Sequence, residues 1–97
     1  MDVGPRTDRH PRIHFPRGMS GARRPALVGT RLYVWQIVDT VRASAASVPD
    51  AADYLQLPES HVRAAIDYYA DYADEVDAYR IEEQDFERRD RARRVLE

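Results

Sequence analysis

The sequence predicts a mainly α-helical protein with a small N-terminal β-hairpin, a winged-like helix-turn-helix core, a long third helix and a C-terminal tail. Three patterns support this fold class. From Val34 onward, apolar residues recur every three or four positions, as they do on one face of a helix. Before Val34, two apolar runs flank Gly29, as the strands of a hairpin flank their turn. Residues 51–66 then fit two short helices that meet at Gln56-Leu57-Pro58.

The length and composition exclude several classes of protein. Ninety-seven residues suit one small domain with a marginal core, so we expect an oligomer or a bound partner to contribute stability. The absence of cysteine excludes disulfides, thiolate metal sites and cysteine catalysis. No apolar run approaches the roughly 20 residues that cross a bilayer, and no signal-peptide pattern opens the chain. We therefore expect a cytoplasmic protein that does not contact a membrane.

The net charge of −2 conceals an asymmetry between the two ends of the chain. Residues 1–42 contain eight arginines and three acids, whereas residues 43–97 contain seven arginines and fourteen acids. All fifteen basic residues are arginine, whose planar guanidinium pairs with phosphate or carboxylate through two hydrogen bonds. We expect the basic front and the acidic back to contact different partners.

Three segments are predicted along the chain. Residues 1–22 form a flexible arm with a short strand near residues 12–15, because they lack helical periodicity. Residues 23–80 form the hairpin and the helix-turn-helix, which we expect to bind DNA and a second copy of the chain. Residues 81–97 form a partner-binding tail, since they are too charged to fold alone and contain apolar anchors.

The hairpin is predicted to pair residues 26–28 with residues 31–34. Gly29 supplies the positive φ that its turn needs. A lone hairpin is marginal in water, so we expect a further strand to join it, for which a second copy of the chain is one source.

Three helices follow the hairpin in this prediction. The first covers residues 34–45, and the second covers residues 49–55 behind a cap at Ser47 or Val48. Pro58 opens the third helix, which is the long one. By the 3.6-residue period, its core face consists of Val62, Ala65, Ile66, Tyr69, Ala73 and Val76.

Residues 51–66 match a helix-turn-helix imperfectly. Ala52 is small, as a residue must be where two helices cross closely, but Gln56 occupies the turn position where a small residue is usual. Two crossing helices are also common in proteins that never touch nucleic acid. This pattern alone therefore leaves DNA binding open.

A stripe of large side chains runs beside the predicted core face of the third helix. It consists of His61, Tyr68, Tyr72 and Tyr79, and is wider than one small domain can cover. We expect a dimer contact, with Leu27 and Leu32 of the hairpin joining Tyr68, Tyr72 and Tyr79. Alternatively, the tyrosines extend the core and keep their hydroxyls in water.

Two stretches resemble a known bacterial family. They are Val28-Gly29-Thr30-Arg31-Leu32-Tyr33-Val34-Trp35-Gln36-Ile37 and Leu57-Pro58-Glu59-Ser60-His61-Val62-Arg63-Ala64-Ala65-Ile66-Asp67-Tyr68. Both are similar to domain-of-unknown-function family 433, whose members are regarded as antitoxin-like proteins of the VapB type. The resemblance covers about residues 24–73.

Some residues depart from the pattern of that family. Tyr33 stands where proline is usual, Leu57 replaces a capping threonine, and the usual glycine after the first helix is missing. The resemblance implies a hairpin-bearing helix-turn-helix, a homodimer, and a partner toxin of the PIN-like ribonuclease class.

A DNA-binding surface is predicted at the start of the third helix. There Arg63 is placed to address guanine, and Ser60 or His61 to hold a phosphate. Arg23, Arg24 and Arg31 would add phosphate contacts that do not depend on sequence. Alternatively, Arg63 pairs with Asp67 in a surface ion pair worth about 0.3–0.5 kcal/mol.

The tail supplies the second candidate site, through the resemblance. An arginine that enters the acidic metal site of a PIN-like nuclease would block it, with apolar side chains as anchors. The predicted toxin-binding residues are Phe86, Arg88, Arg91, Arg94, Val95 and Leu96. Alternatively, these arginines pair with Asp85, Glu87 and Asp90 in a solvated helix end.

Catalysis is the least favoured hypothesis. Asp67, Asp71, Asp74 and Glu75 share one helical side, but no histidine or second acidic helix joins them, so a solvated acidic face fits better than a metal site. His10 and His14 lack further ligands. We therefore expect a protein without catalysis, cofactor or metal. With the resemblance, we expect an antitoxin that neutralises a PIN-like ribonuclease and binds its own operator DNA as a homodimer. The alternative is a free-standing helix-turn-helix regulator of transcription without a toxin partner.

Overall fold

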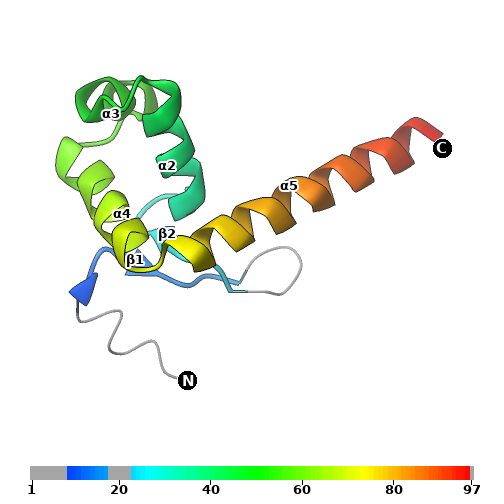
Figure 1. Ribbon diagram of the computed structural model, residues 1–97, viewed down its shortest axis with the longest axis horizontal. Helices are drawn as coiled ribbons and strands as arrows, with labels where there is room; N and C mark the ends of the chain where they lie inside the picture. Colours follow the sequence, from blue (N-terminus) through cyan, green and yellow to red (C-terminus); the bar gives the residue numbers. More distant parts are fainter. Residues whose placement is uncertain (1–8, 18–22, 97) are drawn as a thin grey trace.

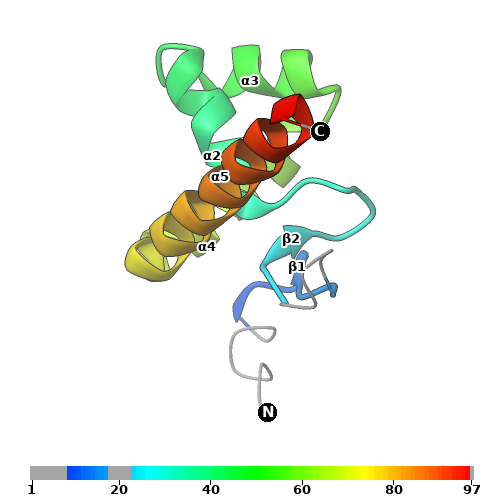
Figure 2. The same ribbon diagram turned by 90° about the vertical axis from the view of Figure 1, so that its right-hand side faces the viewer.

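The computed structural model describes residues 9–17 and 23–96, and the predicted mainly α fold with a small N-terminal antiparallel sheet is confirmed. The elements in chain order are β1 (Ile13–His14), β2 (Ala26–Leu27), α2 (Val34–Ala43), α3 (Val48–Leu55), α4 (Glu59–Asp71) and α5 (Ala73–Leu96). Helices α2, α3 and α4 form a cluster from which α5 projects (Figure 1). The two strands and α3 lie at opposite ends of this cluster (Figure 2).

The predicted arm is ordered over the part that the structure describes. Residues 9–17 contain β1, which confirms the short strand expected there, whereas residues 1–8 and 18–22 lie outside the described residues. β1 runs antiparallel to β2, with Ile13 opposite Leu27. The strand that joins the hairpin region thus comes from the same chain and not from a second copy.

The hairpin across Gly29 is shorter than predicted. Gly29 does adopt a positive φ of 83°, but only one isolated bridge, between Ala26 and Tyr33, links the two sides of the turn. Tyr33 is already the N-cap of α2, so the returning strand has no room to lengthen.

The helix boundaries in the cluster follow the predicted signals closely. Ser47 caps α3, and its hydroxyl accepts a hydrogen bond from the backbone N–H of Asp50 at 3.2 Å. The cap of α4 is Pro58, one residue later than Leu57, and it offers no side-chain acceptor to the free amides.

Among the residues that the structure describes, three other than glycine adopt the left-handed conformation, all at helix ends. Ala45 and Ala46 follow α2 with φ values of 56° and 62°, and Gln56 follows α3 with a φ of 60°. This conformation costs an L-residue roughly 1 kcal/mol, whereas glycine adopts it freely. The glycine expected after the first helix is therefore replaced by two strained alanines.

The predicted long third helix is divided in two at Tyr72. This residue leaves the helical region, with φ −133° and ψ 41°, and its N–H still bonds to the carbonyls of Tyr68 and Tyr69 at 3.0 and 3.2 Å. α5 then begins with Asp74 and Glu75 in its first turn, where acidic side chains suit the positive end of the helix dipole. The break brings Val76, which is 1% exposed, into the common core.

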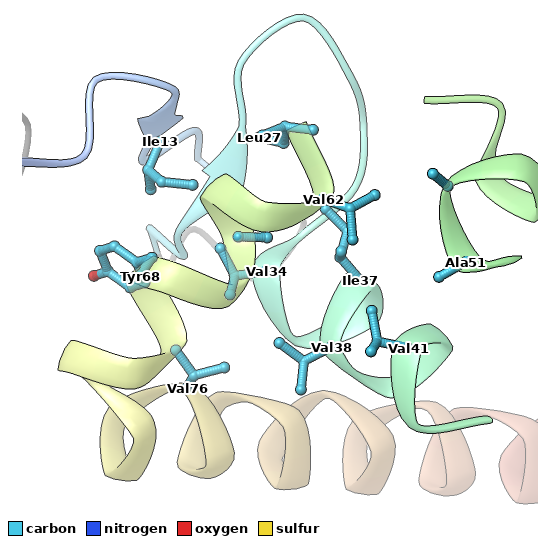
Figure 3. Packing of buried hydrophobic residues seen from close by; sticks show 12 residues of the cluster. Ile13, Leu27, Val34, Ile37, Val38, Val41, Ala51, Val62, Tyr68 and Val76 are labelled. Carbon is cyan, nitrogen blue, oxygen red and sulfur yellow. The ribbon is translucent and has the colours of Figure 1, made fainter. Parts of the chain in front are cut away.

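One hydrophobic core joins the sheet and the helices. Its largest fully buried side chains are Tyr68, Leu27, Ile37, Val34, Val62 and Val76 (Figure 3). Burying one such aliphatic side chain stabilises the fold by about 1.5–3 kcal/mol. The predicted core face of the third helix is confirmed at Val62, Ala65 and Val76. It is shifted by one residue at the tyrosines, because Tyr68 is buried and Tyr69 is half-buried.

Candidate functional site

The start of α4 presents the central residues of the predicted DNA-binding surface. Ser60 and Arg63 are exposed, and Arg63 forms an ion pair with Glu59 at 3.5 Å instead of the alternative pair with Asp67. The pair lies on the surface, where it contributes at most about 0.5 kcal/mol. Arg63 is therefore held weakly and can turn to another anion.

His61 ties the start of α4 to the segment before β1. The guanidinium of Arg12 lies 2.7 Å from His61 Nε2, which accepts this hydrogen bond when the ring is neutral. Beside this contact is a small hollow of about 200 Å³, lined by Pro11, Arg12, Leu27, Val28 and His61. Arg12 thus adds a positive charge to the surface that holds Ser60 and Arg63.

The turn around Gly29 places two exposed side chains, Val28 and Arg31. Thr30 fixes the turn, since its hydroxyl donates to the carbonyl of Leu27 at 2.9 Å and accepts from the N–H of Leu32 at 3.0 Å. Arg31 therefore belongs to a rigid turn whose neighbour Val28 lines the same hollow as His61.

Arg23 and Arg24 have different roles despite being adjacent. Arg23 is exposed and donates to the carbonyl of Phe15 at 3.1 Å, at the end of the sheet away from Arg12. Arg24 is buried: its guanidinium lies 3.0 Å from Glu83 and 3.1 Å from Glu82 of α5, and 4.9 Å from the centre of the Tyr79 ring. The predicted phosphate contact of Arg24 stays a prediction, and it would require the ion pairs with Glu82 and Glu83 to open.

Two of the predicted dimer residues are core residues of the single chain. Leu27 and Tyr68 are 0% exposed and offer no surface to a second copy, because the arm segment and α2 cover them. Leu32, Tyr72 and Tyr79 are half-buried. A second copy thus cannot contact the tyrosine stripe at Tyr68, which lies in its middle. The dimer itself stays a prediction.

The tyrosines instead form hydrogen bonds with carboxylates of α5, and those of Tyr68 and Tyr69 cross the break between α4 and α5. The Tyr68 hydroxyl lies 3.2 Å from Glu75, and the Tyr79 hydroxyl donates to the same carboxylate at 2.9 Å. Tyr69 donates to Asp77 at 3.0 Å. These bonds connect α4 to the first turns of α5.

The same network reaches α2 through Arg42, which the sequence did not single out. Arg42 donates to the Tyr69 hydroxyl at 2.8 Å, and this hydrogen bond raises the pKa of its guanidinium. Arg80 of α5 lies 3.9 Å from Asp39 of α2. The partners are far apart in sequence, so helical periodicity alone could not reveal them.

His10 is a further buried residue that the prediction of a flexible arm missed. It is 7% exposed, its Nε2 lies 2.8 Å from Asp71 Oδ2, and its ring meets the edge of Tyr68 at a centroid distance of 5.1 Å. The arm segment is thus fixed to the end of α4. His14 is exposed, and the two histidines share no ligand set.

The predicted tail, residues 81–97, begins inside α5 and follows this helix to Leu96. Its apolar residues are exposed, with 53% of Phe86, 79% of Val95 and 87% of Leu96 accessible to solvent. α5 has 24 residues and is therefore roughly 36 Å long, against a longest molecular extent of 43 Å. Its end leaves the cluster entirely (Figure 1).

The tail arginines pair within their own helix, as the alternative interpretation expects. Arg88 and Arg89 bind Asp85 at 2.6 and 3.1 Å, and Arg94 binds Asp90 at 2.7 Å. Arg88 and Arg94 are still 73% and 78% exposed, so these pairs are weak and exchangeable. Arg91 is exposed between them.

Over residues 9–17 and 23–96, no group of three or more His, Asp or Glu side chains is arranged to hold a metal ion. Within the same ranges, no helix has the length and apolar character that crossing a membrane requires.

Comparison with known proteins identifies a family and nothing more specific. The family model described as "Protein of unknown function (DUF433)" matches residues 16–69, which is more than half of the chain. Neither the comparison with curated proteins nor the comparison with solved structures gives a match. The matched range begins after β1, covers β2, α2, α3 and most of α4, and ends before α5. By this match, the chain belongs to the DUF433 family.

Proposed function

We propose that this protein is the antitoxin of a type II toxin–antitoxin pair, in which the C-terminal half of α5 binds and blocks a PIN-like ribonuclease. The body, in this proposal, binds operator DNA as a homodimer. The protein is then cytoplasmic and needs no catalysis or cofactor of its own. The observation that carries the proposal is the end of α5, which projects from the cluster (Figure 1). This end combines exposed apolar and arginine side chains.

Such a helix end is poorly stabilised by the chain itself. Residues 84–96 bury no large apolar side chain, and an isolated helix of about 12–15 residues is marginal in water. Phe86, Val95 and Leu96 would gain burial only against another molecule. A segment of this kind becomes fully ordered only when it binds a groove of a partner protein, and its loss of conformational entropy then reduces the binding affinity.

The arginines fit the acidic centre of a nuclease. PIN-like enzymes hold their metal ions with clustered carboxylates, and a guanidinium binds a carboxylate through two parallel hydrogen bonds. Arg88 and Arg94 would exchange Asp85 and Asp90 for the partner's carboxylates, at a cost below about 1 kcal/mol each because both pairs are exposed. Arg91 is exposed as well and completes the candidate set.

DNA binding is assigned to the start of α4 and the neighbouring turn. Ser60, Arg63 and Arg31 are exposed there, and Arg12 beside His61 adds a further cation. Arg63 would read a base edge, and the others would hold phosphates. Arg23 lies at the far end of the sheet and is a separate phosphate contact in this arrangement.

A free-standing transcriptional regulator is the second candidate. The ion pairs of Arg88, Arg89 and Arg94 within α5 favour it, because they satisfy the tail without a partner. Both candidates share the DNA-binding surface, and they differ only in whether a nuclease occupies the tail.

The test is co-expression of the full chain with the tagged product of the adjacent gene. The proposal predicts that the two proteins co-purify, that the chain suppresses ribonuclease activity of the partner, and that removal of residues 84–97 abolishes both effects. Phe86→Asp should weaken the complex at least about tenfold, whereas Gln84→Asp, a neighbouring position, should leave it intact. Equal binding by the truncated and full chains would contradict the proposal.

The DNA-binding part has its own test, a gel shift with the promoter fragment of the gene. Arg63→Ala should weaken the shift and relax its sequence preference, while Arg93→Ala in the tail should not change it. A promoter fragment that never shifts, at any salt concentration, would remove the DNA-binding role.

A further inference from the structure

We propose that a second copy of this chain binds along α5 in antiparallel orientation. The contact surface, named here the α5 seam, consists of Ala78, Ile81, Asp85, Arg88, Ala92 and Val95. This inference specifies the surface of the homodimer in the proposed function and rests on that part alone. It requires neither a nuclease nor DNA. The seam shares Arg88 and Val95 with the proposed nuclease-binding surface, so a nuclease bound there would displace this part of the second copy.

The α5 seam has the period of a coiled coil. Its residues follow one another at spacings of three and four in strict alternation, which places them on one side of the helix. The opposite side of α5 faces the body, where Val76 is buried and Tyr79 and Glu83 contact Arg24. The seam is therefore open along its whole length.

The exposure of apolar residues along the seam supports the binding of a second helix there. Ile81 is 60% and Val95 is 79% exposed, although both are apolar and lie on a regular helix. A shallow surface hollow of about 580 Å³ lies over the middle of the seam, lined in part by Ile81, Gln84, Asp85 and Arg88. Small residues at positions 78 and 92 let a second helix approach closely.

The charge distribution on α5 selects the second copy as the occupant. Residues 74–85 contain six acids and one arginine, whereas residues 86–96 contain two acids and five arginines. Two parallel helices would set acid against acid and arginine against arginine. Two antiparallel helices set the acidic half of each against the basic half of the other, so the helix is complementary to itself.

One register satisfies the whole seam. In this register Ile81 packs on Ala92 of the second copy, Ala78 packs on Val95, and Asp85 faces Arg88. Asp85 and Arg88 already bind each other within one helix at 2.6 Å, and Asp85 also binds Arg89. Pairing would give each of the two a further, oppositely charged neighbour from the second copy. Polar residues inside a coiled-coil seam specify register and orientation, because other registers leave them unpaired.

The test uses the full chain alone and two charge-reversal variants, Asp85→Arg and Arg88→Glu. The parent should form a dimer in sedimentation equilibrium, and each variant alone should dimerise at least tenfold more weakly, because like charges then meet. An equimolar mixture of the two variants should restore a one-to-one heterodimer, since the reversed charges at positions 85 and 88 would again be opposite across the seam. Circular dichroism checks that each variant keeps its helix content.

This mixing experiment separates the proposal from effects within one helix. Loss of the internal pair between Asp85 and Arg88 weakens both variants, but it predicts no recovery on mixing. A monomeric parent, unaffected variants or a mixture without heterodimer would each overturn the proposal. None of these results depends on a nuclease or on DNA, so they leave the antitoxin role to its own test.

Cross-linking provides the second readout, because the chain contains no cysteine. The double variant Ala78→Cys with Val95→Cys should form a disulfide-linked dimer under mild oxidation. Ile81→Cys alone should not, because position 81 faces position 92 in the antiparallel register. Efficient cross-linking through position 81 alone would indicate parallel helices and would also overturn the proposal.

Discussion

Replacement of Arg24 by methionine should destabilise the fold, because this side chain holds α5 against the segment before β2. The guanidinium side chain is 10% exposed and bonds to Glu83, which is 25% exposed, and to Glu82, which is 61% exposed. A hydrogen bond to a charged group contributes about 1.5–3 kcal/mol when it is largely buried, so Glu83 provides the main term. The exposed pair with Glu82 and the contact with the Tyr79 ring each add at most about 1 kcal/mol.

Methionine keeps the apolar stem and removes only the charge and the donors. We expect Arg24→Met to lower the free energy of unfolding by about 2–3 kcal/mol. The matched control is Arg23→Met, where an exposed side chain donates one bond to the Phe15 carbonyl, and a loss below about 1 kcal/mol is expected. Urea titration followed by circular dichroism and by Trp35 fluorescence measures both. Equal losses in the two variants, or a loss under about 1 kcal/mol for Arg24→Met, would show that Arg24 does not hold α5.

Three further substitutions test the fold at other points. Ala46→Gly should stabilise the protein by about 0.5–1 kcal/mol in urea titration, because it relieves a positive φ of 62°. Ala43→Gly, at the last residue of α2, should instead destabilise it by up to about 1 kcal/mol, because glycine loses more conformational freedom in a helix. The same sign for both would contradict the strain. His10→Ala should lower the free energy of unfolding by about 1–3 kcal/mol, because it removes the buried contact with Asp71. His14→Ala, at an exposed position, should change it by less than about 0.5 kcal/mol. Equal melting temperatures of the two variants in thermal unfolding would count against docking of residues 9–17 onto α4. Tyr69→Phe should cost about 1 kcal/mol, because it removes the acceptor for Arg42 and the donor to Asp77. Because the pKa of Arg42 is raised in the folded chain, its contribution to stability is fully present below the pKa of Arg42 in the unfolded chain and is lost only in strongly alkaline solution. The loss of stability caused by Tyr69→Phe should therefore be equal at about pH 6 and pH 9. A loss that changes between these two pH values would contradict this network.

The helices of the cluster were predictable because their signals are local. Apolar periodicity placed α2, and the serine and proline signals placed the starts of α3 and α4 within a residue or two. The positive φ of Gly29 was equally predictable, since a tight turn between two apolar runs favours the residue that adopts this conformation without steric cost.

The break at Tyr72 could not be predicted from the same signals. No glycine or proline marks it, and the apolar residues on its two sides continue one helical period. Only the packing of Tyr68 and Val76 into one core requires the chain to turn there. The prediction placed Tyr69 on the core face, whereas Tyr68 is the buried one, and this error has the same origin. Both tyrosines are amphipathic, so periodicity does not show which of the two is buried.

Side-chain roles depended on long-range partners and were the least predictable part. Arg24 looked like a phosphate contact because it sits in a basic segment, but its partners Glu82 and Glu83 lie nearly 60 residues away. His10 was assigned to a flexible arm for the same reason, since Asp71 is 61 residues distant. The tail was predicted to be too charged to fold alone, whereas the structure continues it as helix α5 through Leu96, with ion pairs between residues three and four positions apart. Its role in binding a partner stays a prediction.

The most direct measurement is hydrogen exchange of the full chain, diluted until it is monomeric, with and without the product of the adjacent gene. The proposed function predicts that the amides of residues 84–96 exchange rapidly in the free chain and become strongly protected in the complex, while those of α2 and α3 barely change. Protection that falls on another surface and leaves residues 84–96 unchanged would contradict the assignment of the tail to the nuclease.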